Sequence, residues 1–197
     1  MQLGKVLLLA VVLLSVKIST MAAAMMSSIP GLCAGTERIL SRLPVMFLGH
    51  GGGPMPLLGH PSHLDLLRTW QAGSSIYEAV HDENVSAIVL ISAHHESNSG
   101  EVLIMADAQP KLLFDYGGFP PETYKYQIPN PGSPNLANRI SGLLNAAGIK
   151  NALETNRGHD HGVFVPILAL EVARKRPTLP LVSISLLGPA DYNLENA

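Results

Sequence analysis

Residues 87–94 read Ala-Ile-Val-Leu-Ile-Ser-Ala-His, and this stretch decides the class of fold. The apolar run from Ala87 to Ile91 is continuous and rich in β-branched residues. Such a run predicts a strand that is covered on both faces, as in a sheet flanked by helices. Polar residues, among them His94, follow the run directly. Loops at the carboxyl ends of strands bind ligands in open α/β sheets, so this segment is also a candidate site.

The sequence on either side alternates between short apolar runs and stretches of helical spacing. Ser133 and Pro134 supply an N-cap and a first-turn proline, and Gly148 can end the helix between them. Residues 107–133 are rich in Pro, Gly and aromatic residues and predict a long irregular segment. The other expected elements are strands at 44–48, 102–106 and 181–187 and helices at 64–80 (in one or two pieces) and 164–174. This order predicts an α/β fold, a layered domain with a central mostly parallel or mixed sheet flanked by helices.

The composition fits one folded domain. Of the 197 residues, 47% are hydrophobic and 14% are charged, which is enough apolar material for a core. The formal net charge of -2 gives no reason to expect a nucleic-acid partner. Cys33 is the single cysteine, so there is no intrachain disulfide framework.

Residues 1–24 differ in composition from the rest, and we expect a signal peptide or leader there. Lys5 precedes an apolar run at 6–16, and small residues follow. The run is shorter than the ~20 residues that cross a bilayer, so no stable membrane span is expected. A used leader implies secretion or the secretory pathway. A cytoplasmic product would result if translation began at an internal methionine, namely Met21, Met25 or Met26. We expect the folded domain at 43–197.

Three histidines stand where such a fold places its chemistry. His50 follows the first expected domain strand, His94 follows the strand at 87–91, and His161 lies near the start of a helix. Imidazoles at the ends of neighbouring parallel strands can face one site, and they suit Zn(II) or Fe(II). The spacing alone also allows the simpler interpretation that these are unrelated polar loop residues.

The glycine run after His50, Gly51-Gly52-Gly53, has two rival interpretations. It is similar to the oxyanion-hole loop of α/β-hydrolase esterases, but the chain has no Gly-x-Ser-x-Gly motif to supply the nucleophile. A phosphate-binding loop is also disfavoured, because no Gly-Lys-Ser/Thr follows. The remaining interpretation is a tight backbone turn beside a ligand.

Five ordered segments together resemble the DOPA-type extradiol dioxygenases, which are class III, LigB-like ring-cleavage enzymes. The resemblance covers about residues 44–187. The segments are Met46-Phe47-Leu48-Gly49-His50-Gly51-Gly52-Gly53-Pro54, Val89-Leu90-Ile91-Ser92-Ala93-His94, Phe114-Asp115-Tyr116-Gly117-Gly118-Phe119-Pro120, Pro131-Gly132-Ser133-Pro134 and Asp160-His161-Gly162.

The resemblance implies roles for the three histidines. His50 and His94 match the family's metal-binding positions. His161 matches a histidine that is treated as the catalytic acid/base and is sometimes counted among the metal ligands. The resemblance further implies one ion per chain, Fe(II) or Zn(II), with a catechol-type small molecule and O2 as substrates.

The resemblance also implies a further segment after the last strand, with a late histidine that completes the family's metal site. Residues 191–197 hold no matching histidine. On this basis we expect the domain to be incomplete at its C-terminal end and the 197 residues alone to have low or no activity. His95 also departs from the family, which usually has a bulky residue such as Trp there.

Other polar residues near these motifs have two interpretations each. His95 should point away from His94, because adjacent strand residues face opposite sides. Arg157 could bind a substrate carboxylate or form a structural ion pair. Asp160 could orient an imidazole or cap the helix. His159 is expected at the surface or behind a ligand, and Asp115 could border the pocket.

Three hypotheses for function follow. The first is an extradiol dioxygenase that inserts both atoms of O2 into a catechol such as DOPA at a non-haem Fe(II) centre. The second is a truncated, non-catalytic zinc-binding relative of that family. The third is a zinc hydrolase on a similar sheet, which would act without consuming oxygen.

Overall fold

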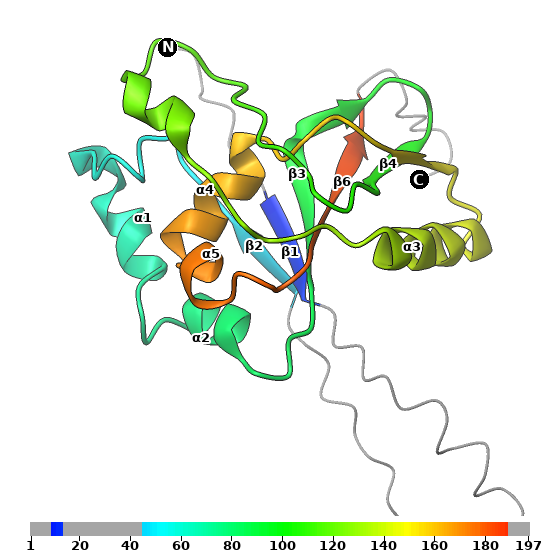
Figure 1. The fold of residues 1–197 in the computed structure, drawn as a ribbon, viewed down its shortest axis with the longest axis horizontal. Helices are drawn as coiled ribbons and strands as arrows, with labels where there is room; N and C mark the ends of the chain where they lie inside the picture. The colour runs from blue at the N-terminus through cyan, green and yellow to red at the C-terminus, as the bar shows by residue number, and fades with distance from the viewer. Residues whose placement is uncertain (1–8, 14–44, 189–197) are drawn as a thin grey trace, which may run out of the picture.

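The computed structural model describes residues 9–13 and 45–188, which form one mixed sheet flanked by helices (Figure 1). This arrangement confirms the predicted α/β class. The sheet has six strands in the order β2-β1-β3-β6-β4-β5. The strands are β1 (Leu9–Leu13), β2 (Val45–Leu48), β3 (Ile88–Ser97), β4 (Val102–Met105), β5 (Asn151–Glu154) and β6 (Leu181–Leu187). The helices are η1 (Pro61–His63), α1 (Leu64–Thr69), α2 (Ser75–His81), η2 (Pro121–Lys125), α3 (Pro134–Ala146), α4 (His161–Ala169) and α5 (Val172–Lys175).

The strand directions bring the ends of β2 and β3 to one edge of the sheet. Strand β1 pairs antiparallel with both β2 and β3, and β3 pairs parallel with β6. Strands β2, β3 and β6 therefore run in the same direction, whereas β4 and β5 run in the other. The carboxyl end of β2 leads to His50, and that of β3 carries His94. The topology thus places two of the three candidate histidines at the same edge.

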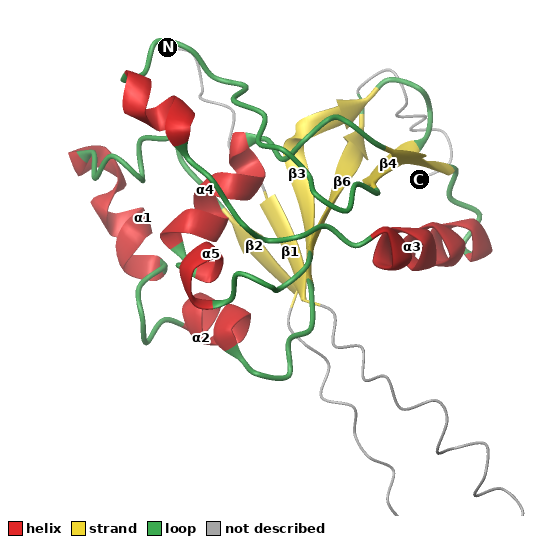
Figure 2. Cartoon of the chain, in the orientation of Figure 1, coloured by secondary structure: helices red, strands yellow, loops and turns green. Residues whose placement is uncertain are grey.

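Side chains on the two faces of the sheet enter two separate apolar clusters. On β3, Ile88 and Leu90 belong to the larger cluster, which includes residues of α2, α4 and α5. Val89 points to the smaller cluster, which includes Ala137 and Ile140 of α3. Figure 2 shows α1, α2, α4 and α5 grouped near β1 and β2, with α3 beside β4. The continuous apolar run of β3 is thus explained by helices on both faces.

Most expected elements are present, with two differences in their bounds. Strand β3 continues to Ser97, with a register shift against β6 between Ser92 and Glu96. The helix expected at 164–174 is two helices that meet at Leu170 and Glu171. Glu171 has a left-handed backbone with φ of 57°, and its carboxylate accepts a hydrogen bond from Tyr77 Oη at 2.7 Å. A left-handed backbone is uncommon for a non-glycine residue, and it separates the two helices here.

Two strands were not anticipated from the sequence. Strand β5 is only four residues long and pairs parallel with β4. Strand β1 lies within the apolar run 6–16, where a leader is expected from the composition. A short apolar run suits a strand as well as a leader. The rest of residues 1–24, as well as Cys33, lies outside the described residues, so the leader stays a prediction.

The long segment between β4 and α3 is irregular, as expected, and aromatic contacts tie it to the core. The ring of Phe114 lies 5.5 Å from that of the buried Phe164 in α4. Tyr116 Oη donates to the carbonyl oxygen of Thr123 at 2.7 Å. Helix α3 begins as predicted, with Ser133 Oγ accepting from the Leu136 amide at 3.2 Å. Within the described residues, no helix is long and apolar enough to cross a membrane.

Replacing Phe164 should weaken both the core and this segment. Phe164→Ala is expected to lower the free energy of unfolding by about 3–5 kcal/mol, because it removes a fully buried ring. Leu143→Ala, at a position that is 59% exposed, serves as the control and should change stability by less than about 0.5 kcal/mol. Urea denaturation of both variants would measure this. Equal losses in the two variants would contradict the core assignment.

Candidate metal centre

His50, His94 and His161 come together in the folded chain. The Nε2 atoms of His50 and His94 are 3.1 Å apart. The ring centroid of His161 lies 5.0 Å from that of His50 and 3.8 Å from that of His94. Each residue offers one ligand atom, and these atoms all lie within 4.8 Å of one another. Among the described residues this is the group of metal-ligand side chains that is compact enough to hold an ion.

The spacing of the ring nitrogens and the burial of the rings fit a metal ion. Two imidazole nitrogens that share an ion at ~2.0–2.1 Å are about 3 Å apart, close to the spacing of the His50 and His94 nitrogens. His50 is 1% exposed and His161 is 6% exposed, so water has little access to either ring. The three imidazoles therefore form a donor set suited to a transition-metal ion such as iron or zinc.

The environment keeps two of these rings neutral. Burial, followed by the proximity of His161 and His94, lowers the pKa of His50 to about 4. Burial and then His161 also lower the pKa of His94. A neutral imidazole has a free lone pair, which metal coordination requires. At neutral pH the cluster needs little or no deprotonation at these two positions before it can bind an ion.

The first turn of α4 approaches β3 closely, and this approach builds the cluster. Ser92 Oγ donates to Asp160 Oδ1 at 2.7 Å, which ties the start of α4 to the strand. A Cβ atom at Gly162 would lie 2.8 Å from Cδ2 of His94. Arg157 donates to Asp160 Oδ2 and to the carbonyl oxygen of His94, each at 3.1 Å. These contacts hold the backbone of His94 beside the start of α4.

A carboxylate from the irregular segment completes the arrangement. Asp115 Oδ1 accepts hydrogen bonds from His161 Nδ1 at 2.7 Å and from the His161 amide at 3.0 Å. Its other oxygen, Oδ2, lies 3.9 Å from His94 Nδ1. Burial alone would raise the pKa of Asp115, but the hydrogen bonds from His161 outweigh it, so this pKa is lowered. The carboxylate is therefore ionised at neutral pH.

The glycine run after His50 forms a tight turn with side chains packed against it. Gly51 and Gly53 have φ values of 75° and 51°. A Cβ atom at Gly51 would lie 2.2 Å from the His63 ring, and one at Gly53 would lie 3.1 Å from the Phe119 ring. These observations confirm the interpretation of the run as a turn that needs glycine.

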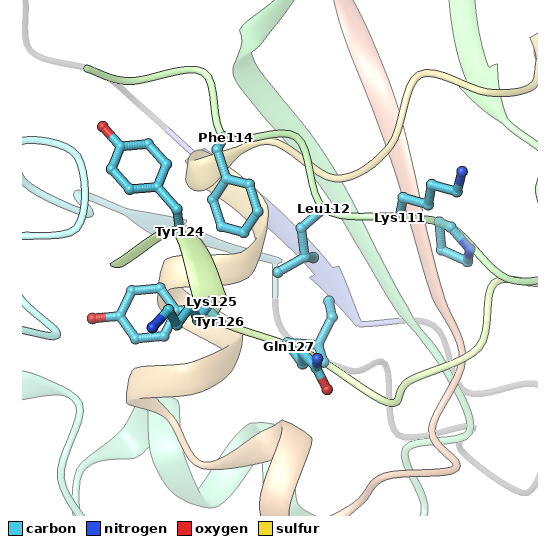
Figure 3. Close-up of a pocket in the computed structure, with 9 residues that line it drawn as sticks. Lys111, Leu112, Phe114, Tyr124, Lys125, Tyr126 and Gln127 are labelled. Atoms are coloured by element: carbon cyan, nitrogen blue, oxygen red, sulfur yellow. The ribbon is translucent and has the colours of Figure 1, made fainter. Parts of the chain in front are cut away.

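Aromatic side chains extend outward from His161. The Tyr116 ring lies 5.8 Å from His161 and 6.0 Å from Phe114. Phe114, Tyr124 and Tyr126 line a pocket of about 410 Å³. Figure 3 shows these side chains, and none of the three histidines lines the pocket. The pocket is therefore a neighbour of the histidine cluster and not part of it.

The structure resolves several of the open alternatives. His95 faces away from the cluster, with Nε2 3.0 Å from Glu154 Oε2. Arg157 forms the structural ion pair with Asp160. Asp160 occupies the N-cap position of α4, but its side chain bonds to Ser92 and Arg157 instead of capping.

One of the two placements expected for His159 is excluded, and one important contact was missed. His159 is fully buried and so does not lie at the surface, and neither of its ring nitrogens has a hydrogen-bond partner among the described residues. The bond between Asp115 and His161 joins residues 46 positions apart. No local pattern predicts such a pair. The sequence indicated Asp115 only as part of the segment Phe114–Pro120, and not as a partner of His161.

The α/β fold and the cluster of three histidines, two of which have a lowered pKa, define the class of the chain as that of candidate metal-binding α/β proteins. Comparison with known proteins narrows this class. Residues 48–194 match the family described as the catalytic LigB subunit of aromatic ring-opening dioxygenase, and the chain belongs to that family.

Several curated proteins are similar to the chain. It is 36% identical to Dioxygenase tasH of Hapsidospora irregularis over 151 residues, covering 75% of this chain and 45% of the relative. It is 32% identical to 4,5-DOPA dioxygenase extradiol of Beta vulgaris over 153 residues, covering 77% and 54%. The protein of the same name in Escherichia coli (strain K12) is 34% identical over 157 residues, covering 79% and 52%. The chain thus spans about half the length of the curated relatives it matches.

The close approach of α4 to β3 predicts a strong effect of one added methyl group. Gly162→Ala should displace the His94 ring and weaken Co²⁺ binding by about 10–100-fold, the range seen when the supports of metal ligands are altered. Gly142→Ala in α3 is the matched control, because a Cβ atom there meets nothing within 4 Å. Titration with Co²⁺, followed by its absorption spectrum, measures both variants. Equal affinities would argue against this packing.

Buried neutral histidines predict a loss of stability in mild acid. Burial is the first cause that lowers the pKa values of His50, His95 and His159 to about 4, from an ordinary value of 6.5. Between these values the unfolded chain binds protons that the folded chain does not. Stability therefore falls as pH falls through this window, by up to about 1.4 kcal/mol per pH unit for each histidine.

Urea denaturation of the metal-free chain at pH 7.5, 5.5 and 4.5 tests this dependence. His159→Leu should make the dependence shallower, because it removes one titrating group that bonds to no described side chain. Equal stability at pH 7.5 and 4.5 in the unsubstituted chain would show that these rings are not held neutral.

Proposed function

We propose that the chain carries the metal centre of an extradiol dioxygenase, which inserts both atoms of O2 into a catechol and opens the ring beside the diol. The observation that carries the proposal is the buried cluster of His50, His94 and His161 in a chain of the ring-opening dioxygenase family. His50 and His94 would bind the metal. His161 could serve as a third ligand or, with Nε2 free of the metal, as the proton-transfer residue, and we assign it the second role.

The proposed cofactor is one Fe(II) ion per chain. Such an ion would supply a path for electrons from the catechol to O2 and would ease deprotonation of the catechol, which amino-acid side chains alone do not provide. A site with few protein ligands leaves positions open for two substrates. Zn(II) fits the same imidazole donors and is the alternative ion.

His161 is the residue we assign to proton transfer. Its Nδ1 is bound to Asp115, so Nε2 is the nitrogen that can meet substrate. A neutral Nε2 can accept the proton of a phenolic hydroxyl and later return it to the product, as general acid–base catalysis requires. The ionised Asp115 would stabilise the protonated ring between these two steps.

A DOPA-like catechol is the proposed substrate. The relatives from Beta vulgaris and Escherichia coli (strain K12) are both named 4,5-DOPA dioxygenase extradiol. Tyr116 lies next to His161, and Phe119 packs against Gly53 in the turn after His50. We expect these two rings to border the aromatic substrate, since ring pairs gain from stacked and edge-on contacts.

Anaerobic reconstitution with Fe(II) tests the proposal. Both the 197-residue chain and a version lengthened to the size of its relatives should be loaded and then mixed with DOPA and air. Following our expectation from the sequence, we predict little turnover in the shorter chain. The longer version should take up oxygen and form a yellow ring-opened product.

Single substitutions then assign this activity to the cluster. His50→Ala and His94→Ala should each weaken iron binding by more than about 100-fold and abolish oxygen uptake. His60→Ala, in a loop and exposed, should leave both unchanged. Stoichiometric metal in a folded chain of either length, without oxygen uptake, would favour the non-catalytic zinc-binding relative. Hydrolysis without oxygen uptake would favour the zinc hydrolase.

A further inference from the structure

Asp115 makes an unusual pair of contacts with the first residue of α4. A single oxygen, Oδ1, accepts from both the ring nitrogen Nδ1 and the backbone amide of His161, at 2.7 and 3.0 Å. Asp115 belongs to the irregular segment between β4 and α3, far from His161 in sequence. One carboxylate oxygen thus fixes the backbone and the ring of the same residue.

The contact also gives a partner to one of the free amides at the start of α4. Amide groups in the first turn of a helix lack partners within the helix, and the N-cap side chain commonly supplies one. Asp160 holds the N-cap position of α4 but makes no such hydrogen bond, because its carboxylate is bound to Ser92 and Arg157. Asp115 instead accepts from the amide of His161, the first residue of the helix, which an N-cap side chain does not normally reach.

The same contact decides which ring nitrogen of His161 carries the proton. A carboxylate only accepts hydrogen bonds, so Nδ1 must carry a hydrogen to make a bond of 2.7 Å. In the neutral ring Nε2 is then unprotonated and has a free lone pair. The side chain of Asp115 is 22% exposed and that of His161 is 8% exposed, so the bond is largely shielded from water.

We propose that Asp115 is a positioning residue, which holds His161 in the tautomer with the proton on Nδ1 and presents Nε2 to the space beside His50 and His94. The importance of this role for catalysis rests on the proposed function, but the tautomer itself can be measured without activity. The 3.9 Å approach of Asp115 Oδ2 to His94 Nδ1 brings the same carboxylate near a second ring of the cluster.

Long-range ¹H–¹⁵N correlation spectra of the metal-free, histidine-labelled 197-residue chain at pH 8.5 test the proposal. His161→Gln identifies the signals of His161. The unsubstituted chain should show His161 with a proton on Nδ1 and none on Nε2. In Asp115→Ala the ring should shift largely to the Nε2-protonated form, which is the more common form of an unconstrained imidazole.

Two further variants sharpen the test. Asp115→Asn keeps an acceptor oxygen but removes the charge, so the Nδ1 proton signal should remain and move upfield. Asp107→Ala is the matched control, because the Asp107 carboxylate also accepts a hydrogen bond from a loop amide, that of Asn156 at 2.7 Å, away from the cluster. It should leave the His161 signals unchanged.

An unchanged Nδ1–H pattern in a folded Asp115→Ala chain would overturn the proposal. If that variant does not fold, an unmoved Nδ1 proton in Asp115→Asn would overturn it instead. In the iron-loaded, active form, Asp115→Ala should lower kcat by about 100-fold or more, with a smaller change in KM. The two proposals can fail separately. If the spectra show the expected tautomer but neither the 197-residue chain nor the longer version takes up oxygen, the proposed function is refuted and the positioning role stands.

Discussion

The close approach of the first turn of α4 to strand β3 is the constraint on which the candidate site depends. Ser92 and Asp160 hydrogen-bond across this contact, and Gly162 leaves room for the His94 ring. Because His161 is the first residue of α4, any change in this spacing would move it relative to His94. The core supports the same contact, since Val163, Phe164 and Val165 are fully buried in the larger apolar cluster. The packing of the core thus fixes the position of His161 relative to His94.

Burial also sets the electrostatics of the site. Imidazoles held this close cannot all be protonated, and desolvation lowers the pKa values of His50 and His94 further. The ionised carboxylate of Asp115 also reaches this cluster, and it accepts hydrogen bonds from His161. The result is a division of roles within a compact site, in which two neutral rings are ready to bind a metal and a third is paired with a carboxylate. Such differences in environment are typical of sites that bind ions and transfer protons.

Much of the fold could be predicted from local sequence, because the elements concerned have strong local signals. Strand β6 and helix α3 were expected from an apolar run and from a Ser-Pro start, and both are present. The break at Glu171 was not foreseen. The Glu171 side chain bonds to Tyr77, 94 positions away, and no local pattern contains that contact. The gathering of three histidines followed from their places at strand and helix ends. The contacts of Asp115 with His161 depend on how a long irregular segment folds back, and no spacing rule contains that information.

The central claim is that His50 and His94 hold one metal ion beside His161. X-ray absorption spectroscopy of the anaerobic, Fe(II)-loaded chain tests it most directly, because imidazole rings bound to a metal produce a characteristic outer-shell scattering pattern. We predict a strong imidazole pattern at one iron per chain, reduced in His50→Ala and in His94→Ala and retained in His60→Ala. An imidazole pattern that is absent, or that is unchanged in both cluster variants, would place the metal elsewhere.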